Sequence, residues 1–158
     1  MGGDVRLRDL TRDDLPDIFE QQLDVEANRM AAFTVEDPAD RDAFRKRWKK
    51  LMQDRSIVKK AVLSEGRLAG YVVAFTFLGE RTVGYWLGKA YWGRGIASSA
   101  LADFVSLLAE RPLYARVAKD NAGSIRVLEK SGFAVVGEDK GFSYARREEV
   151  EEFVYKLE

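Results

Sequence analysis

The chain has 158 residues, the length of one ordinary domain, and its 26 basic and 26 acidic residues leave no net charge. This balance gives no overall attraction to nucleic acid or to an anionic membrane, so neither is expected as a partner. The sequence contains no cysteine and no histidine, which excludes thiol nucleophiles, disulfides, Cys/His metal sites and histidine acid–base chemistry, and no metal is expected.

The N-terminus is too charged for a signal peptide, and no apolar run reaches the ~18 residues of a membrane span. We therefore expect one cytoplasmic domain over residues 1–158.

Residues 5–8 alternate apolar and basic side chains, which is typical of a short edge strand. Thr11, followed three residues later by Asp14, forms an acidic variant of the capping box and predicts a helix start there.

Residues 24–35 show weaker periodicity, and we expect a short helix or loop that serves as a lid facing the substrate. Asp37 before Pro38 predicts the start of the next helix, because proline is well tolerated at the first helical position. Apolar side chains then recur at helical spacing, at Phe44, Trp48, Leu51 and Met52. The lysines and arginines between them are interpreted as a solvated helix face.

Three β-rich runs follow at residues 57–63, 68–78 and 82–87, with glycine-containing turns between them. They predict an antiparallel meander. A helix is expected over residues 96–109 and a strand over 113–117, which would pair in parallel with the third strand of the meander because a helix connects the two. The sheet should therefore be mixed.

The last third of the chain predicts one more helix and a final hairpin. Residues 121–130 carry an apolar stripe and end at Ser131-Gly132, a helix stop. Residues 133–136 and 150–157 have strand character. The fold class is α/β in the broad α+β sense, with a mostly antiparallel sheet.

A glycine-dense turn, Gly93-Arg94-Gly95, separates the third meander strand from the following helix. Backbone N–H groups at a helix N-terminus attract anions, and glycine lets an anion approach the main chain. A nucleotide P-loop is excluded because no Lys-Ser or Lys-Thr pair opens the helix. A dinucleotide fingerprint is disfavoured, because the strand at 113–117 carries no acid to bind a ribose.

The run from Trp92 to Ala97, WGRGIA, resembles the R/Q-x-x-G-x-G/A pyrophosphate loop of the GNAT superfamily of coenzyme-A-dependent N-acetyltransferases. Residues 121–124, NAGS, followed by SGF at 131–133, resemble the N-x-x-S…G-F motif of the same family. The two motifs cover about residues 80–135 and are most similar to the subgroup of ribosomal-protein N-terminal acetyltransferases. The chain departs from the pattern at Trp92, where the family usually has Arg or Gln.

The resemblance implies a GNAT acyl-CoA fold with helices on both faces of the sheet and acetyl-CoA as co-substrate. It places the pantetheine arm beside the third meander strand, in a splay next to residues 113–117. The implied coenzyme-binding residues are Tyr85, Trp86, Leu87, Trp92, Gly93, Arg94, Gly95, Ile96, Ala97, Ser98, Asn121 and Ser124.

The implied reaction is direct attack of a primary amine, from a peptide N-terminus or a small molecule, on the thioester. The backbone N–H of Leu87 is the candidate for polarising the carbonyl. Ser124 is the candidate acid for the thiolate, and Glu26 is the first choice of base. Glu20, Asp24 and Glu80 stay open as alternative bases, since the strand at 82–87 carries no carboxylate.

The alternative function is a non-catalytic module of the same fold that binds acyl-CoA as a sensor. An aromatic platform for nucleic-acid bases at residues 85–92 is a weaker alternative, because aromatic side chains on a strand more often line a core or tunnel. Members of the family are often dimers, and a homodimer is one expectation that the resemblance carries. No motif identifies the acceptor or the length of the acyl group.

Overall fold

A seven-stranded mixed sheet runs through residues 4–158, the part of the chain that the computed structural model describes, with strand order β1-β2-β3-β4-β5-β7-β6. The strands are β1 (Val5–Asp9), β2 (Val58–Ser64), β3 (Arg67–Phe77), β4 (Glu80–Leu87), β5 (Leu113–Ala118), β6 (Ala134–Ser143) and β7 (Glu148–Leu157). The helices are α1 (Leu15–Gln22), α2 (Val25–Ala31), α3 (Arg41–Gln53), α4 (Ile96–Leu107) and α5 (Ala122–Lys130), with short 3-10 turns η1 (Arg12–Asp14) and η2 (Lys89–Tyr91).

The antiparallel meander predicted from the sequence is confirmed in β2, β3 and β4. Each of its two hairpins turns on two residues with positive φ, at Glu65 and Gly66 (51° and 80°) and at Leu78 and Gly79 (52° and 77°). Such turns match the twist of the flanking strands. Strand β1 pairs with β2 at the edge of the sheet, as its short alternating sequence predicts.

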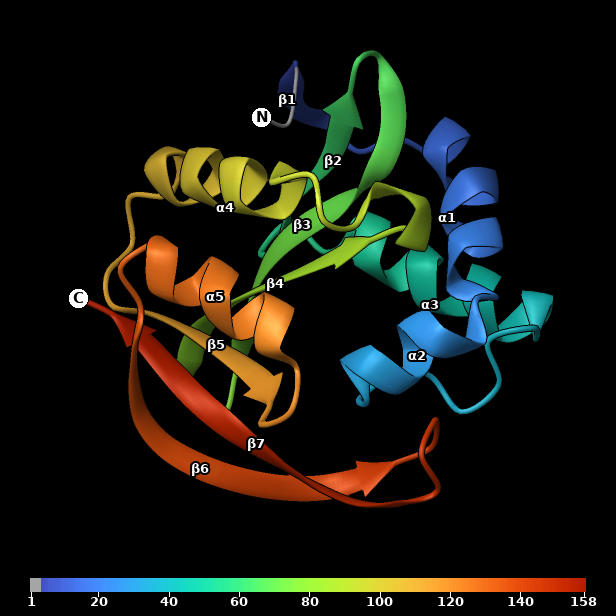
Figure 1. Cartoon of the computed structure of the whole chain (residues 1–158). Coiled ribbons are helices and arrows are strands. Elements are labelled where there is room, and N and C mark those ends of the chain that lie inside the picture. Colours follow the sequence, from blue (N-terminus) through green and yellow to red (C-terminus); the bar gives the residue numbers. More distant parts are fainter. Residues whose placement is uncertain (1–3) are drawn as a thin grey trace.

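The sheet divides between β4 and β5. These strands run parallel, as predicted, but their only paired position is Thr82 with Tyr114. On its other side β4 stays paired with β3 up to Leu87. The end of β4 therefore leaves β5, and a wedge-shaped splay opens between the two strands. Figure 1 shows the two halves of the sheet diverging from this point.

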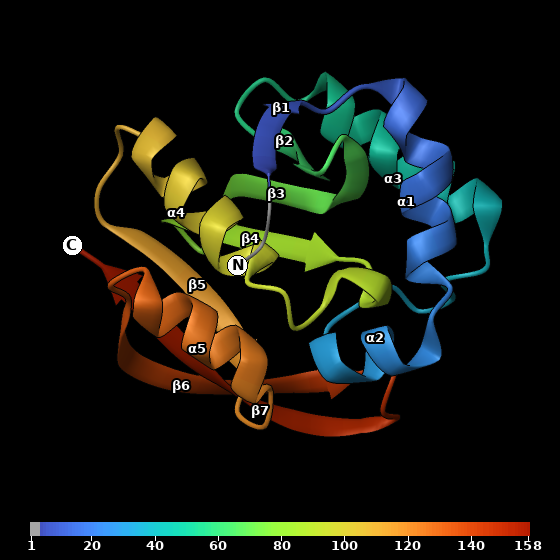
Figure 2. The ribbon, with the colours of Figure 1, turned by 45° about the horizontal axis from the view of Figure 1, so that its top comes forward.

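Helices cover both faces of the sheet. Helices α4 and α5 lie on one face, in front of the strands in Figure 1 and nearer to the viewer in Figure 2. Their apolar residues pack against the central strands, with Ile96, Leu101 and Phe104 almost fully buried. Helix α3 packs on the other face, where the ring centroid of Trp48 lies 5.1 Å from that of Tyr71 of β3. The striped sequence of α3 thus faces the sheet as predicted.

Two boundaries differ from the prediction. Helix α3 begins at Arg41 and not at Asp37-Pro38, because Asp40 caps it by accepting a hydrogen bond from the N–H of Ala43 at 3.0 Å. Asp37 instead closes a separate turn, in which its carboxylate accepts from the N–H of Ala39. Strand β6 extends to Ser143, well beyond residue 136, because its polar stretch is held in the sheet by β7. Local hydrophobicity carries no signal for such a strand.

The first helical segment confirms its predicted cap. The carboxylate of Asp14 accepts the N–H of Thr11 at 2.8 Å and forms a two-point ion pair with Arg8 of β1. This hydrogen bond with Arg8 keeps the pKa of Asp14 below its usual range.

The weakly periodic segment after α1 contains α2, which Asp24 caps through the N–H of Ala27. Within residues 4–158 no helix is long and apolar enough to cross a membrane.

Candidate active site

A cavity of about 520 Å³ lies at the end of β4, beside the splay. Four segments enclose it: α2, the end of β4, the glycine loop with the first turn of α4, and α5. The first turn of α5 and the glycine loop are far apart in the sequence, and the splay brings them together. The cavity includes all the predicted coenzyme contacts except Arg94: Tyr85, Trp86, Leu87, Trp92, Gly93, Gly95, Ile96, Ala97, Ser98, Asn121 and Ser124.

The glycine loop is shaped to present backbone N–H groups to the cavity. Gly93 and Gly95 have φ angles of +75° and +76°, in the left-handed region, and a Cβ atom at either position would meet no other atom within 4 Å. Backbone conformation alone therefore requires glycine there. Ser99 donates to the carbonyl of Gly95 at 3.1 Å. The N–H groups of residues 96–98 precede that first helical bond, and such unpaired groups at a helix N-terminus suit an anion at the cavity wall.

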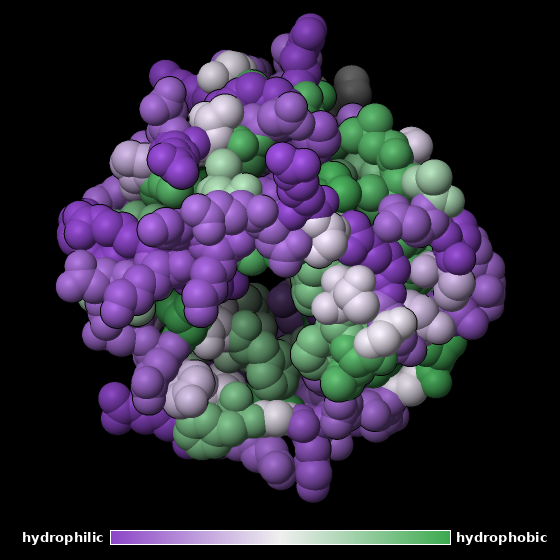
Figure 3. All heavy atoms as spheres, turned by 180° about the vertical axis from the view of Figure 1, so that it is seen from behind, coloured by the Kyte–Doolittle hydropathy of each residue, from purple (hydrophilic) through white to green (hydrophobic). Residues whose placement is uncertain are grey.

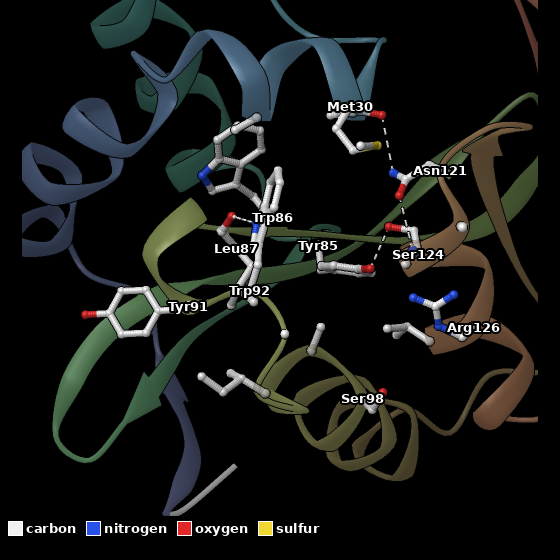
Figure 4. A pocket seen from close by; sticks show the side chains of 18 of the residues that line it. Met30, Tyr85, Trp86, Leu87, Tyr91, Trp92, Ser98, Asn121, Ser124 and Arg126 are labelled. Atoms are coloured by element: carbon white, nitrogen blue, oxygen red, sulfur yellow. Dashed lines mark hydrogen bonds between the residues drawn. The ribbon is translucent and has the colours of Figure 1, made fainter. Parts of the chain in front are cut away.

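Trp92 links the glycine loop to the end of β4. Its indole Nε1 donates a hydrogen bond to the backbone carbonyl of Leu87 at 2.9 Å. Figure 4 shows this bond beside the cavity. The family usually has a charged or amide side chain at this position. In this chain an aromatic donor instead binds the carbonyl of Leu87, the residue whose N–H is the candidate for polarising a thioester.

Two hydroxyl groups meet at the centre of the cavity wall. The phenol oxygen of Tyr85 on β4 lies 2.7 Å from the Oγ of Ser124 on α5, and either atom can donate the proton. Burial raises the pKa of Tyr85 above its ordinary value, and the hydrogen bond with Ser124 partly opposes this shift. Both hydroxyls therefore stay protonated at neutral pH. Together they can donate to a sulfur or oxygen in the cavity.

Asn121 has a capping role that the sequence also allows. Its Oδ1 accepts the N–H of Ser124 at 3.2 Å and so begins α5. Its Nδ2 donates to the carbonyl of Met30, at the end of α2, at 3.3 Å. The side chain therefore connects α2 with the helix that carries Ser124, as Figure 4 shows.

Sequence reasoning missed two cations. Arg126 and Lys130 lie four residues apart on α5, line the cavity, and form no ion pair within residues 4–158. Arg126 extends from α5 toward the cavity (Figure 4). Their spacing on one helix face could have identified them, since side chains at i and i+4 point the same way. They add positive charge to a cavity that already presents a helix N-terminus.

Two predicted site residues lie outside the cavity wall. Arg94 points its guanidinium toward the ring of Tyr91, with 5.7 Å between the Cζ atom and the ring centroid. Glu26, in the first turn of α2, forms an ion pair with Lys89 of η2 at 2.8 Å. Its side chain is 58% exposed. Helix α2, in the segment expected to act as a lid, lines the cavity through its apolar residues Ala27, Met30 and Ala31.

A second opening faces the opposite side of the sheet. Seen from behind, the molecule is hollowed near its centre, with hydrophobic walls inside a hydrophilic rim (Figure 3). Because side chains alternate along a strand, Gly84 and Trp86 of β4 point away from the face to which Tyr85 points.

A split sheet with a glycine loop at a helix N-terminus and paired hydroxyls beside the split is the arrangement expected of an acyl-coenzyme-A transferase. The sequence pattern of the acetyltransferase (GNAT) domain matches residues 4–134. The chain therefore belongs to the GNAT acetyltransferase family, and the predicted fold and family resemblance are confirmed. No curated protein sequence is significantly similar to the chain.

Solved structures share the fold over nearly the whole chain. RimJ of Mycobacterium smegmatis, in complex with CoA-disulfide, is 20% identical with a TM-score of 0.83, over 99% of this chain and 82% of that one. Spermidine N-acetyltransferase of Vibrio cholerae, in complex with CoA and spermine, is 17% identical with a TM-score of 0.79. The match covers 97% of this chain and 94% of that one. Ribosomal-protein-S5-alanine acetyltransferase of Vibrio fischeri is 19% identical with a TM-score of 0.75. The match covers 97% of this chain and 92% of that one.

Proposed function

We propose that the protein transfers the acetyl group of acetyl-CoA directly to a primary amine. The observation that carries this proposal is the cavity at the splay, which has an anion site at the start of α4 and a hydroxyl pair beside the end of β4. The first suits the pyrophosphate of coenzyme A, and the second suits its sulfur. Arg126 and Lys130 add cations for the coenzyme phosphates.

The proposed reaction needs no covalent enzyme intermediate. The pantetheine arm lies in the splay and pairs with the edge of β4 as an added strand. The amine attacks the thioester carbon, and the N–H of Leu87 stabilises the charge on the carbonyl oxygen. The C–N bond forms, the C–S bond breaks, and the thiolate takes a proton from Ser124. Ser124 regains a proton through its hydrogen bond to Tyr85, and Tyr85 in turn regains one from solvent at the open side of the cavity.

The amine must lose a proton, since alkylamines have a pKa near ~10 by analogy with lysine. Glu26 is the proposed acceptor of that proton. Because its carboxylate is exposed and bound to Lys89 rather than on the cavity wall, it would act through water. Substitution of Glu26 by Gln should lower the rate most at low pH, where little free amine exists. An unchanged pH profile would exclude this residue as the base.

Two measurements test the function in order. Isothermal titration with acetyl-CoA should show binding, and the absence of binding at high micromolar ligand would refute the proposal. A thiol-release assay over amines then tests transfer, with product mass as a second readout. Binding without turnover on any amine would favour the alternative, an acyl-CoA-binding sensor module.

The acceptor is proposed to be a peptide N-terminus or a small-molecule amine that enters from the hollow in Figure 3. Structures of the same fold include a spermidine N-acetyltransferase and a ribosomal-protein alanine acetyltransferase. The amine panel should therefore contain polyamines and short peptides with free N-termini. The same samples test the expected homodimer by sedimentation velocity.

A further inference from the structure

Arg146, in the turn between β6 and β7, joins three segments that are distant in the sequence. Its Nε donates to the backbone carbonyl of Arg29 at 2.7 Å, and one terminal nitrogen lies 3.5 Å from the carbonyl of Met30. Its two terminal nitrogens also bind both carboxylate oxygens of Asp120 at 2.7 and 2.9 Å. The side chain is only 13% exposed. This group of contacts is called the Arg146 clamp below.

The clamp holds the end of α2. The last carbonyls of a helix have no partner within the helix and carry partial negative charge, so a guanidinium there is favourable. Next to it, the Oγ of Ser143 donates to the carbonyl of Ala32 at 2.5 Å and accepts the N–H of Arg146 at 3.1 Å. Ser143 is fully buried. The β6–β7 turn is thus fixed to the end of α2 at three carbonyls, those of Arg29, Met30 and the C-cap residue Ala32.

The clamp also holds the loop before α5. Asp120 is ion-paired with Arg146, and this hydrogen bond keeps the pKa of Asp120 below its usual range. The next residue, Asn121, donates to the same Met30 carbonyl that Arg146 approaches and caps the helix that bears Ser124. A continuous hydrogen-bonded path therefore runs from the end of α2 through Asn121 to the Tyr85–Ser124 pair (Figure 4).

Both segments that the clamp joins are walls of the cavity. Met30 and Ala31 line it from α2, and Asp120 and Asn121 line it from the loop. Arg146 does not line the cavity, so it can act only through these walls. The anion site at the start of α4 is built from other elements and shares no hydrogen bond with the clamp.

We propose that Arg146 is a positioning residue for the transfer reaction. It fixes α2, the segment expected to face the acceptor, and, through Asp120 and Asn121, the Tyr85–Ser124 pair beside the thioester. This inference rests on the proposed acetyltransferase function. Its consequence is a separation of effects. Loss of the clamp should disturb the acceptor side and the hydroxyl pair, while the pyrophosphate site at α4 is retained.

The central test replaces Arg146 by Gln and by Lys, with Asp120→Asn as a milder variant that keeps the contacts to α2. Arg147→Gln is the matched control, because Arg147 lies in the same turn, is exposed and carries the same charge. Acetyl-CoA affinity is measured by titration, and kcat and KM are measured for the best amine. We expect Arg146→Gln to raise the acceptor KM about tenfold and to change acetyl-CoA affinity by less than about twofold.

Arg146→Lys should recover only part of the loss, because lysine cannot bind a carboxylate at two points and a helix end at once. Hydrogen exchange at α2 should be faster in Arg146→Gln, and Arg147→Gln should match the native protein in every readout. An unchanged acceptor KM in Arg146→Gln, or equal losses in acceptor KM and acetyl-CoA affinity, would overturn the positioning role. If Arg146→Gln fails to fold, the same criteria apply to Asp120→Asn.

A native protein that binds acetyl-CoA but acetylates no amine would refute the proposed function and the clamp's role together. An active native protein whose variants follow the control would refute the clamp alone. The two failures are therefore distinguishable.

Discussion

Replacing Gly95 by Ala is the sharpest test of the anion loop. The φ angle of Gly95 is +76°, and a Cβ atom there would contact nothing within 4 Å. The substitution therefore adds no steric clash, and its effect is backbone strain alone, about 1 kcal/mol for a residue with a Cβ in this region.

In the free protein the loop can relax and release that strain, but the coenzyme pyrophosphate requires the original direction of the N–H groups that follow Gly95. Binding must then restore the strained backbone, at a cost of about 1–2 kcal/mol, so the Kd for acetyl-CoA should rise about tenfold. Isothermal titration measures this change directly.

Gly79→Ala is the matched control. Gly79 lies in the β3–β4 turn with a φ of +77° and likewise has nothing within 4 Å of a Cβ. It does not line the cavity. Both variants should lower the melting temperature by at most about 4 °C, but only Gly95→Ala should weaken acetyl-CoA binding. Equal affinities for the two variants would refute the assignment of the loop as the pyrophosphate site.

Three further substitutions test other parts of the site and the fold. Trp92→Phe keeps an aromatic side chain but removes the hydrogen bond to the Leu87 carbonyl, worth about 1 kcal/mol, so kcat should fall about fivefold. An unaltered kcat would contradict the role of this bond in holding Leu87. Tyr85→Phe should lower kcat about tenfold. Because burial raises the pKa of Tyr85, deprotonation of Tyr85 should not lower the kcat of the native protein below a pH of about 10. Asp14→Asn should reduce the free energy of unfolding by about 2 kcal/mol at neutral pH. Because Arg8 lowers the folded-state pKa of Asp14, this stabilisation is fully present above the unfolded pKa of about 3.9 and is lost as pH falls through the folded pKa. In denaturant titrations the difference between the two proteins should therefore shrink steadily as the pH falls from about 5 to about 3.

The sequence was sufficient for the parts of the fold that local chemistry determines. The β2–β3 hairpin follows from a glycine turn, and the cap at Thr11 follows from an acid three residues later. The glycine loop was recognisable because left-handed backbone at Gly93 and Gly95 leaves few alternatives to glycine. These features depend on short-range interactions, which sequence patterns record well.

Features that depend on distant partners were not predictable. Strand β6 is extended because β7 pairs along its polar length. The hydrogen bond from Trp92 to Leu87 and the approach of Arg146 to the end of α2 require the folded loops. The position of Glu26 depends equally on its partner, Lys89, which no spacing rule connects to it. Roles that arise from tertiary contacts therefore need the structure.

The single paired position between β4 and β5 has a thermodynamic consequence. Past Thr82 the facing edges of the two strands no longer bond to each other, so the halves of the sheet are joined there through helices and loops. A pantetheine arm that pairs with the edge of β4 would supply contacts between the two halves of the sheet that the polypeptide lacks there. Since ligand at a hundred times its Kd stabilises a fold by about 2.7 kcal/mol, supply of acetyl-CoA would govern how long the enzyme survives as well as how fast it turns over.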